Sequence, residues 1–210
     1  MNETHVLVMA KSPIPGRVKT RLCPPRTFVE AAGLAAAALA DTLLAVSSLD
    51  VRHVLALEGP VGEWLPAGFD VIAQRGEGLA ERLANAWSDA DGPGLQIGMD
   101  TPQITPALLE DALDHLHRPG IDAVLGDATD GGWWAIGLHR PDAKVFAGVP
   151  MSDETTGARQ RARLRRLGLR IGDLPVLTDV DTMADAAEGA ASAPTTQFAH
   201  TLRALQAVSQ

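Results

Sequence analysis

Four cationic side chains are crowded into the segment that follows the first apolar run of the chain. The stretch Met9–Leu22 carries Lys11, Gly16, Arg17, Lys19 and Arg21, in a chain whose formal net charge is -8. Like charges at this density repel one another unless an anion receives them. Lysine and arginine bind phosphate oxygens through charge-assisted hydrogen bonds, and a glycine lets the backbone approach a ligand closely. The stretch therefore predicts a phosphate site for a nucleotide, and the alternative is a solvated basic loop.

A carboxylate follows a second apolar run. Asp100 lies in Gly98–Pro102, directly after the expected strand Leu95–Met99. A hard carboxylate oxygen there could hold Mg²⁺ or Mn²⁺, which bridges and neutralises phosphate oxygens. The simpler interpretation is an Asx turn before Pro102.

A third group combines a turn signal with two aromatic residues. Asp130, Gly131 and Gly132 stand between apolar runs and are followed by Trp133 and Trp134. Asp-Gly is a common tight-turn pair, and tryptophan is more often part of a core than a ligand platform. In a strand the two rings point to opposite faces, so at most one of them would contact a ligand.

Two weaker signals lie near the end of the chain. Asp181 precedes an expected helix, where it supplies the cap or acts as a second metal ligand. Five arginines lie on the helix expected over 155–167, which predicts a solvated surface or, more sharply, a site for an anionic acceptor: Arg159, Arg161, Arg163, Arg165 and Arg166.

Short apolar runs alternate with helical stretches along the chain. The expected strands are His5–Ala10, Val51–Leu57, Phe69–Ala73, Leu95–Met99, Ala123–Gly126 and Trp133–Leu138. The expected helices are Phe28–Ser48, Leu79–Ser88, Pro106–Leu116 and Thr155–Leu167. This order is typical of a single Rossmann-like α/β domain, with a mostly parallel sheet and helices on both faces. Loops at the carboxyl ends of its strands form the ligand edge.

Composition limits the remaining possibilities. The length suits one domain, expected over 1–190, with 191–210 as a helical appendage of it. The negative charge argues against nucleic acid as a partner. The apolar stretch Ala31–Ala40 is expected to be too short to cross a membrane. With Cys23 as the single cysteine, a cytoplasmic location is expected.

The order of these motifs resembles a bacterial family. The motifs are Lys11–Leu22, Gly78–Arg82, Gly98–Pro102, Asp130–Gly132 and Asp179–Thr182, and the resemblance extends to about Glu188. The family is DUF2064, also called the radical-SAM/selenodomain-associated transferase 1 glycosyltransferases. It implies a glycosyltransferase-A or nucleotide-diphospho-sugar transferase fold. The first loop also resembles, more loosely, that of 2-phospholactate guanylyltransferase.

By position, the resemblance implies roles for individual residues. It implies phosphate binding by Lys11, Lys19 and Arg21, metal binding by Asp100, and a site wall at Asp130 and Gly131. The sequence departs from the family pattern at three places that bear on the acceptor. Asp127 stands where a proline is expected, Trp133-Trp134 replaces a tyrosine-based pair, and Met151-Ser152-Asp153 replaces Trp-Ser-Thr.

Three functions follow from these observations. The first is a metal-dependent glycosyltransferase that uses a nucleotide-diphospho-sugar and an unknown small-molecule acceptor, with Lys19 and Asp100 as catalytic residues. The second is a nucleotidyltransferase that joins a nucleoside triphosphate to a phosphorylated acceptor and releases pyrophosphate. Four loop cations suit a triphosphate, whereas the family name favours glycosyl transfer. The third is a nucleotide-binding module without catalysis.

Overall fold

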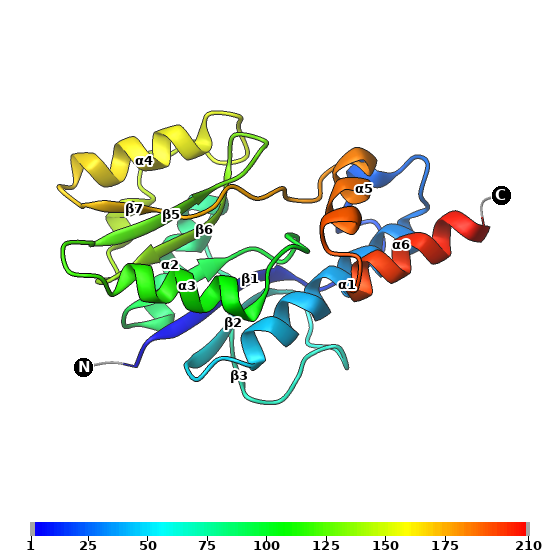
Figure 1. Cartoon of the computed structure of the whole chain (residues 1–210), viewed down its shortest axis with the longest axis horizontal. Helices are drawn as coiled ribbons and strands as arrows, with labels where there is room; N and C mark the ends of the chain where they lie inside the picture. Colours follow the sequence, from blue (N-terminus) through cyan, green and yellow to red (C-terminus); the bar gives the residue numbers. More distant parts are fainter. Residues whose placement is uncertain (1–2, 209–210) are drawn as a thin grey trace.

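A seven-stranded sheet crosses the molecule, in a computed structural model that describes residues 3–208 (Figure 1). Across the sheet the strands are β3 (Phe69–Ala73), β2 (Arg52–Glu58), β1 (His5–Lys11), β4 (Gly94–Ile97), β6 (Trp133–Leu138), β5 (Ala123–Asp127) and β7 (Ile171–Asp173). β6 runs antiparallel to both of its neighbours, and the other pairs are parallel. The expected mostly parallel α/β sheet is confirmed.

Two details of the sheet differ from the sequence-based expectation. β5 and β6 form an antiparallel hairpin, because the segment 128–132 between them is too short for a helical crossover. β7 was not expected, since three residues are too few to show a periodic pattern. The reversal of β6 places its first residue, Trp133, at the edge where β1, β4 and β5 end. The hairpin turn therefore reaches the ligand edge of the sheet.

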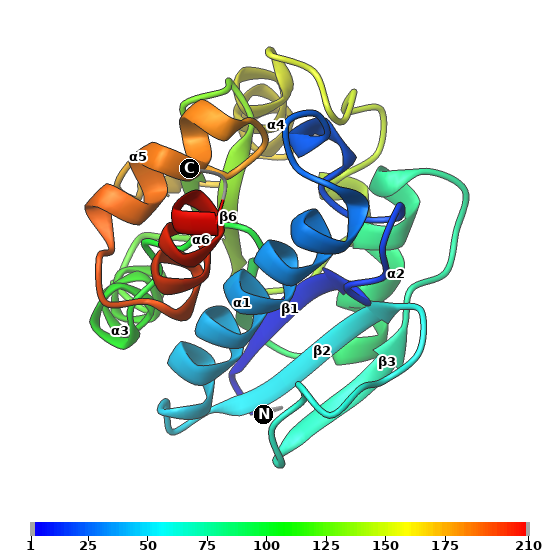
Figure 2. The ribbon, with the colours of Figure 1, turned by 90° about the vertical axis from the view of Figure 1, so that its right-hand side faces the viewer.

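Helices cover both faces of the sheet. On one face α1 (Phe28–Ser47) and α3 (Pro106–Leu116) bury leucines and alanines against β1 and β4. On the other face α2 (Leu79–Ala90), the short helix η2 (Ala143–Val145) and α4 (Thr156–Arg166) pack against β1, β5 and β6. Figure 2 shows α1 lying across the sheet in front of β1. The edge strand β3 is only partly covered. Each of its five residues is half-buried or exposed.

α1 is the long apolar helix of the fold. The Thr27 side chain accepts a hydrogen bond from Glu30 N, and the Glu30 carboxylate accepts one from Thr27 N. This capping box fixes the start of the helix at Phe28. The expectation that its apolar part is too short to span a membrane was wrong on length, because the helix has 20 residues with mean hydropathy 1.7. However, 61% of its apolar window is buried inside the fold, as in the core helix of a globular protein.

The last two helices pack on α1 rather than on the sheet. α5 (Met183–Ser192) and α6 (Gln197–Val208) share a small core with it, which contains Leu34, Phe198 and Leu202. The Asp41 carboxylate accepts hydrogen bonds from the backbone N–H groups of Gln197 and Phe198, at 2.9 and 2.8 Å. The start of α6 is thereby fixed to α1. This packing also holds α5 beside the loop that follows β1 (Figures 1 and 2).

Candidate functional site

A pocket of about 820 Å³ opens at the edge where β1 and β4 end. Its walls come from the loop after β1, the loop after β4, the β5–β6 turn, the segment before α4 and the segment before α5. The sequence-predicted residues that line it are Lys11, Arg17, Lys19, Arg21, Asp100, Asp130 and Asp181. These elements are far apart in the sequence, and the parallel strands bring them to one edge.

Lys19 lies among the carboxylates of the pocket. Its Nζ atom is 2.5 Å from Asp100 Oδ2 and 3.2 Å from Asp181 Oδ1, and its side chain is only 11% exposed. Burial disfavours the charged form, but the attraction of Asp100 and Asp181 outweighs it and raises the pKa of Lys19 above its ordinary value. Lys19 is therefore an ammonium ion held inside the protein.

The other loop cations are nearer to solvent. Arg21 pairs with Asp181 at 2.8 Å and is 71% exposed, and Lys11 pairs with Glu58 at 3.3 Å. Within residues 3–208, the Arg17 side chain has no ion-pair partner. Three of the four cations are thus received by carboxylates of the protein itself. The density of positive charge therefore does not by itself require a bound phosphate. The argument for a phosphate site depends on the pocket that these cations line.

Asp179 is a pocket residue for which the sequence predicted no ligand role. Burial raises the pKa of its carboxyl to about 7, and the negative charges of Asp100 and Asp130 add to this effect. The Thr101 hydroxyl donates a hydrogen bond to it and acts in the opposite direction. Its sequence signals are its spacing from Asp181 and its place at the start of the motif Asp179–Thr182. The helix cap suggested for Asp181 belongs to Thr182, which forms a capping box with Asp185.

The β5–β6 turn shapes one wall of the pocket. Asp130 lines the pocket, and its carboxylate accepts a hydrogen bond from Gly132 N at 2.8 Å. Gly131 has φ +87°, and a Cβ atom there would overlap the backbone of Glu154. Gly131 and Gly16 stand outside the pocket lining. Gly16 has φ +77°, and a Cβ atom there would be in ordinary van der Waals contact with the Phe28 ring. Both glycines therefore set the backbone path of their loops.

The two tryptophans lie on opposite faces of the sheet, as expected. Trp134 is 1% exposed, and its Nε1 atom donates to Pro175 O at 2.8 Å. Trp133 packs beside the core of the other face and stays half-buried. Both rings border the pocket. Trp133 is the one with surface left for a ligand, because Trp134 is fully enclosed.

Other pocket residues were not singled out as ligand contacts from the sequence. Gln74 Nε2 donates to Ala10 O at 2.8 Å and Ala56 O at 2.9 Å, at the ends of two strands. The loop before α4 contributes Met151, Ser152, Asp153 and Glu154. The sequence marked Met151-Ser152-Asp153 only as a departure from the family pattern, and the position of α4 identifies all four residues as pocket residues. Of the Gly78–Arg82 motif, Leu79 alone lines the pocket.

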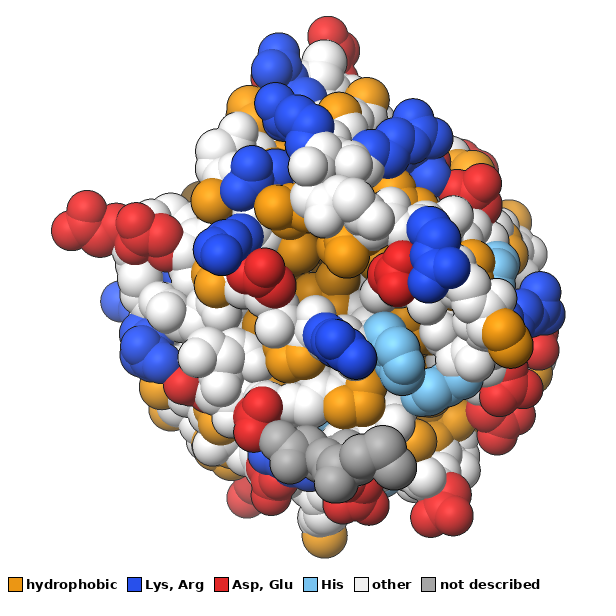
Figure 3. All heavy atoms as spheres, turned by 90° about the vertical axis from the view of Figure 1, so that its left-hand side faces the viewer, with side chains coloured by type: hydrophobic (Ala, Val, Ile, Leu, Met, Phe, Trp, Pro, Cys, Tyr) orange, Lys and Arg blue, Asp and Glu red, His pale blue; other side chains and the backbone are white. Residues whose placement is uncertain are grey.

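The arginines of α4 lie away from the pocket. None of the five lines it among the described residues. Arg161 pairs with Asp127 at 2.8 Å and with Asp173, while Arg163 Nε donates to Lys144 O at 2.8 Å. Figure 3 shows lysine and arginine side chains gathered toward the top of one face, at the height of α4 in Figure 1. The solvated surface is the interpretation that this position favours.

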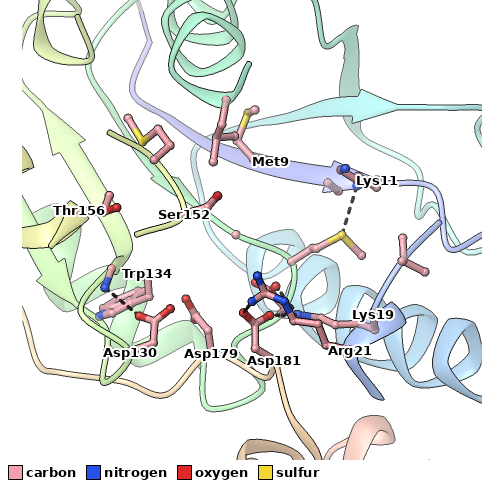
Figure 4. Close-up of a pocket in the computed structure, with 18 of the residues that line it drawn as sticks. Met9, Lys11, Lys19, Arg21, Asp130, Trp134, Ser152, Thr156, Asp179 and Asp181 are labelled. Atoms are coloured by element: carbon pink, nitrogen blue, oxygen red, sulfur yellow. Dashed lines mark hydrogen bonds and ion pairs between the residues drawn. The ribbon is translucent and has the colours of Figure 1, made fainter. Parts of the chain in front are cut away.

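Carboxylate oxygens are the donors that Mg²⁺ and Mn²⁺ prefer, and the pocket contains several. In the part of the chain that the structure describes, no group of three or more His, Cys, Asp or Glu residues is arranged to hold a metal ion. Instead, the ammonium of Lys19 bridges Asp100 and Asp181, so one cation already stands between these carboxylates (Figure 4). Asp100 and Asp181 thus have the oxygen donors that a divalent cation prefers, and the Lys19 ammonium marks a position between them where a positive charge is held.

Comparisons with known proteins identify a matching family and a similar solved structure. The family described as "Uncharacterized protein conserved in bacteria (DUF2064)" matches over residues 31–153. The sequence matches none of the curated proteins. A crystal structure of a candidate nucleotide-diphospho-sugar transferase from Desulfovibrio desulfuricans G20 is 28% identical, with a TM-score of 0.87, over 99% of this chain and 96% of that one.

More distant structures share the fold. One is CMP:2-keto-3-deoxy-manno-octonic acid synthetase complexed with CTP, at 15% identity and a TM-score of 0.58 over 100% of both chains. Another is 2-C-methyl-D-erythritol 4-phosphate cytidylyltransferase from Thermus thermophilus, at 16% identity and a TM-score of 0.56, which covers 93% of this chain and 100% of that one. At these identities the likeness shows the fold alone.

Proposed function

The chain belongs to the DUF2064 family, and from this premise and the geometry of the pocket we propose that it is a cytoplasmic transferase that acts on a nucleotide donor. One observation carries the proposal. A pocket of about 820 Å³, large enough for a nucleotide, brings the cations of the β1 loop and the carboxylates after β4 and before α5 to one edge of the sheet. The similar structures, by their names, include enzymes that use nucleotides.

Glycosyl transfer from a nucleotide-diphospho-sugar is our first choice of reaction. An acceptor oxygen attacks the anomeric carbon, the bond from that carbon to the diphosphate breaks, and the acceptor proton passes to a pocket carboxylate. Lys11, Arg17 and Arg21 bind the diphosphate from the pocket rim, and Lys19 binds it from inside. Asp100 and Asp181 would hold Mg²⁺ or Mn²⁺, which when bound supplies positive charge to the leaving diphosphate.

Nucleotidyl transfer is the second candidate. All four loop cations line the pocket, and that number suits a triphosphate better than a diphosphate. In this reaction a phosphate oxygen of the acceptor attacks the α-phosphorus of a nucleoside triphosphate, and pyrophosphate leaves toward the same cations. A nucleotide-binding module without catalysis is a third candidate, and it is favoured if the pocket carboxylates bind no metal.

A ligand panel separates these candidates. The protein is unfolded thermally with each nucleoside triphosphate and each common nucleotide-sugar, with Mg²⁺ and with EDTA. A ligand at one hundred times its dissociation constant stabilises by about 2.7 kcal/mol. Stabilisation by nucleotide-sugars, with release of the nucleoside diphosphate when an acceptor is added, supports glycosyl transfer. Stabilisation by triphosphates alone contradicts it, and stabilisation by no nucleotide contradicts the proposal as a whole.

Matched variants locate the site. Asp100→Asn removes a pocket carboxylate, whereas Asp111→Asn changes an exposed aspartate on α3 outside the pocket. We expect Asp100→Asn to abolish the Mg²⁺-dependent part of the stabilisation and Asp111→Asn to leave it unchanged. Equal behaviour of the two variants would mean that the metal is held elsewhere.

A further inference from the structure

The backbone conformation of Lys19 directs its side chain into the pocket. The residue has φ 47°, in the left-handed region that few residues other than glycine adopt, and its carbonyl accepts a hydrogen bond from Leu22 N at 3.0 Å. From this position the side chain reaches carboxylates that follow β4 and precede α5 (Figure 4). The ammonium is thus enclosed between two segments that are distant in the sequence.

The single positive charge of Lys19 is already shared between two carboxylates. In the structure it neutralises Asp100 and Asp181, at 2.5 and 3.2 Å. A phosphate that takes the ammonium leaves Asp100 without a cation and leaves Asp181 with the exposed Arg21 alone. Conversely, a divalent cation that takes the carboxylate oxygens displaces the ammonium. Only 11% of the Lys19 side chain is exposed, so an ammonium there without an anion is costly. Binding of a metal at the carboxylates therefore favours binding of a phosphate at the ammonium, and the reverse.

We propose that Lys19 is the counter-ion of Asp100 and Asp181 and that it exchanges places with the metal. When nucleotide and metal enter together, the ammonium moves from the carboxylates to the phosphates, and the metal takes its former position. This inference rests on the proposed function and adds to it a dependence of metal binding on nucleotide binding. The metal alone binds weakly, because it must displace Lys19, whereas nucleotide removes that competitor.

Arg21 differs from Lys19 in this respect. It contacts Asp181 from the solvent side and is 71% exposed, so water replaces its interaction at little cost. Lys19, with 11% of its side chain exposed, has no such replacement. The exchange is therefore a property of Lys19 and not of every cation in the loop.

Binding of Mn²⁺ alone tests the exchange without any turnover. Free Mn²⁺ is followed by its electron paramagnetic resonance signal in titrations of the wild type, Lys19→Gln, Lys19→Arg and Lys144→Gln. We expect Lys19→Gln to bind Mn²⁺ about tenfold more tightly than the wild type, which corresponds to about 1.4 kcal/mol. Lys19→Arg keeps the positive charge and should stay weak, and Lys144, which lies on η2 outside the pocket, serves as the control. Equal affinity of Lys19→Gln and the wild type overturns the proposal.

A second measurement uses the wild type and does not depend on a variant that folds. Lysine amines are labelled by reductive methylation and quantified by mass spectrometry, with and without saturating Mn²⁺. Because the metal displaces a buried ammonium, we expect labelling of Lys19 to rise several-fold while that of Lys11 and Lys144 stays constant. Unchanged labelling of Lys19 at saturation overturns the exchange. Such a result leaves the nucleotide panel untouched, so failure of the exchange and failure of the proposed function are told apart.

Discussion

His5 is a buried imidazole that stays neutral in the folded protein. It is 0% exposed, and neither ring nitrogen has a hydrogen-bond partner within residues 3–208. Its ring meets Trp87 edge-on, with centroids 5.3 Å apart. Burial, with a further contribution from the positive charge of Arg52, lowers the pKa of His5 from 6.5 to about 4. The folded state therefore resists protonation of a group that the unfolded chain protonates readily.

This shift predicts a loss of stability in acid. Between pH 6.5 and about 4 the unfolded state binds the additional proton, so the free energy of unfolding falls as the pH falls through this window. The full shift corresponds to about 3 kcal/mol. Urea unfolding at pH 7 and at pH 4.5 is compared for the wild type and His5→Leu, and the variant should lose less stability.

The comparison between variants is necessary because Asp179 acts with the opposite sign. Its raised pKa makes the folded state bind the additional proton below about pH 7, which favours folding as the pH falls. The difference between wild type and variant removes this contribution. An identical pH dependence in both proteins would show that His5 is accessible to protons in the folded state.

At the scale of elements, the β5–β6 turn is locked to the start of α4. Gly157 N donates to Gly131 O at 2.8 Å, and the backbone of Glu154 occupies the space that a Gly131 side chain would need. Gly131→Ala should therefore destabilise the protein by more than about 1 kcal/mol, because both the positive φ and the overlap oppose it. Thermal unfolding measures the loss. Gly168→Ala is the matched control, since it has positive φ (+77°) but open space around it. A loss no larger than that of Gly168→Ala would mean that the contact with α4 yields easily.

The sequence predicts such local features well and their long-range partners poorly. The Asp-Gly turn and most strands follow from patterns of a few residues. The pairing of Lys19 with Asp100 and Asp181 does not, because nothing near Lys19 in the sequence shows which carboxylates the sheet brings to it. Asp179 was not predicted for the same reason, since its perturbed pKa arises from burial and from Asp100 and Asp130. The loop was predicted as a binding site, and its internal neutralisation was not.

At the scale of the molecule, the C-terminal helix α6 completes the fold on the α1 side. Phe198 is 1% exposed and packs in the small core with Leu34 and Leu202. Phe198→Ala should cost about 3–5 kcal/mol, because it leaves a cavity in that core. Urea unfolding measures this cost, with Leu44→Ala as the control, since Leu44 is 63% exposed. Nucleotide affinity of the folded variant should be unchanged, because Phe198 stands outside the pocket lining. A cost as small as that of Leu44→Ala would mean that α6 contributes little to stability.

The ion pair between Lys19 and Asp181 joins residues that are 162 positions apart. While the chain is being synthesised, the first loop leaves the ribosome long before its partner does. During that interval the loop lacks the carboxylate of Asp181, which receives Lys19 and Arg21 in the folded protein. Of the loop cations, Arg21 depends on that late segment for its carboxylate, whereas Lys19 can pair with Asp100 and Lys11 with Glu58 before it is made. A chain truncated before Asp181 would therefore leave Arg21 without its carboxylate.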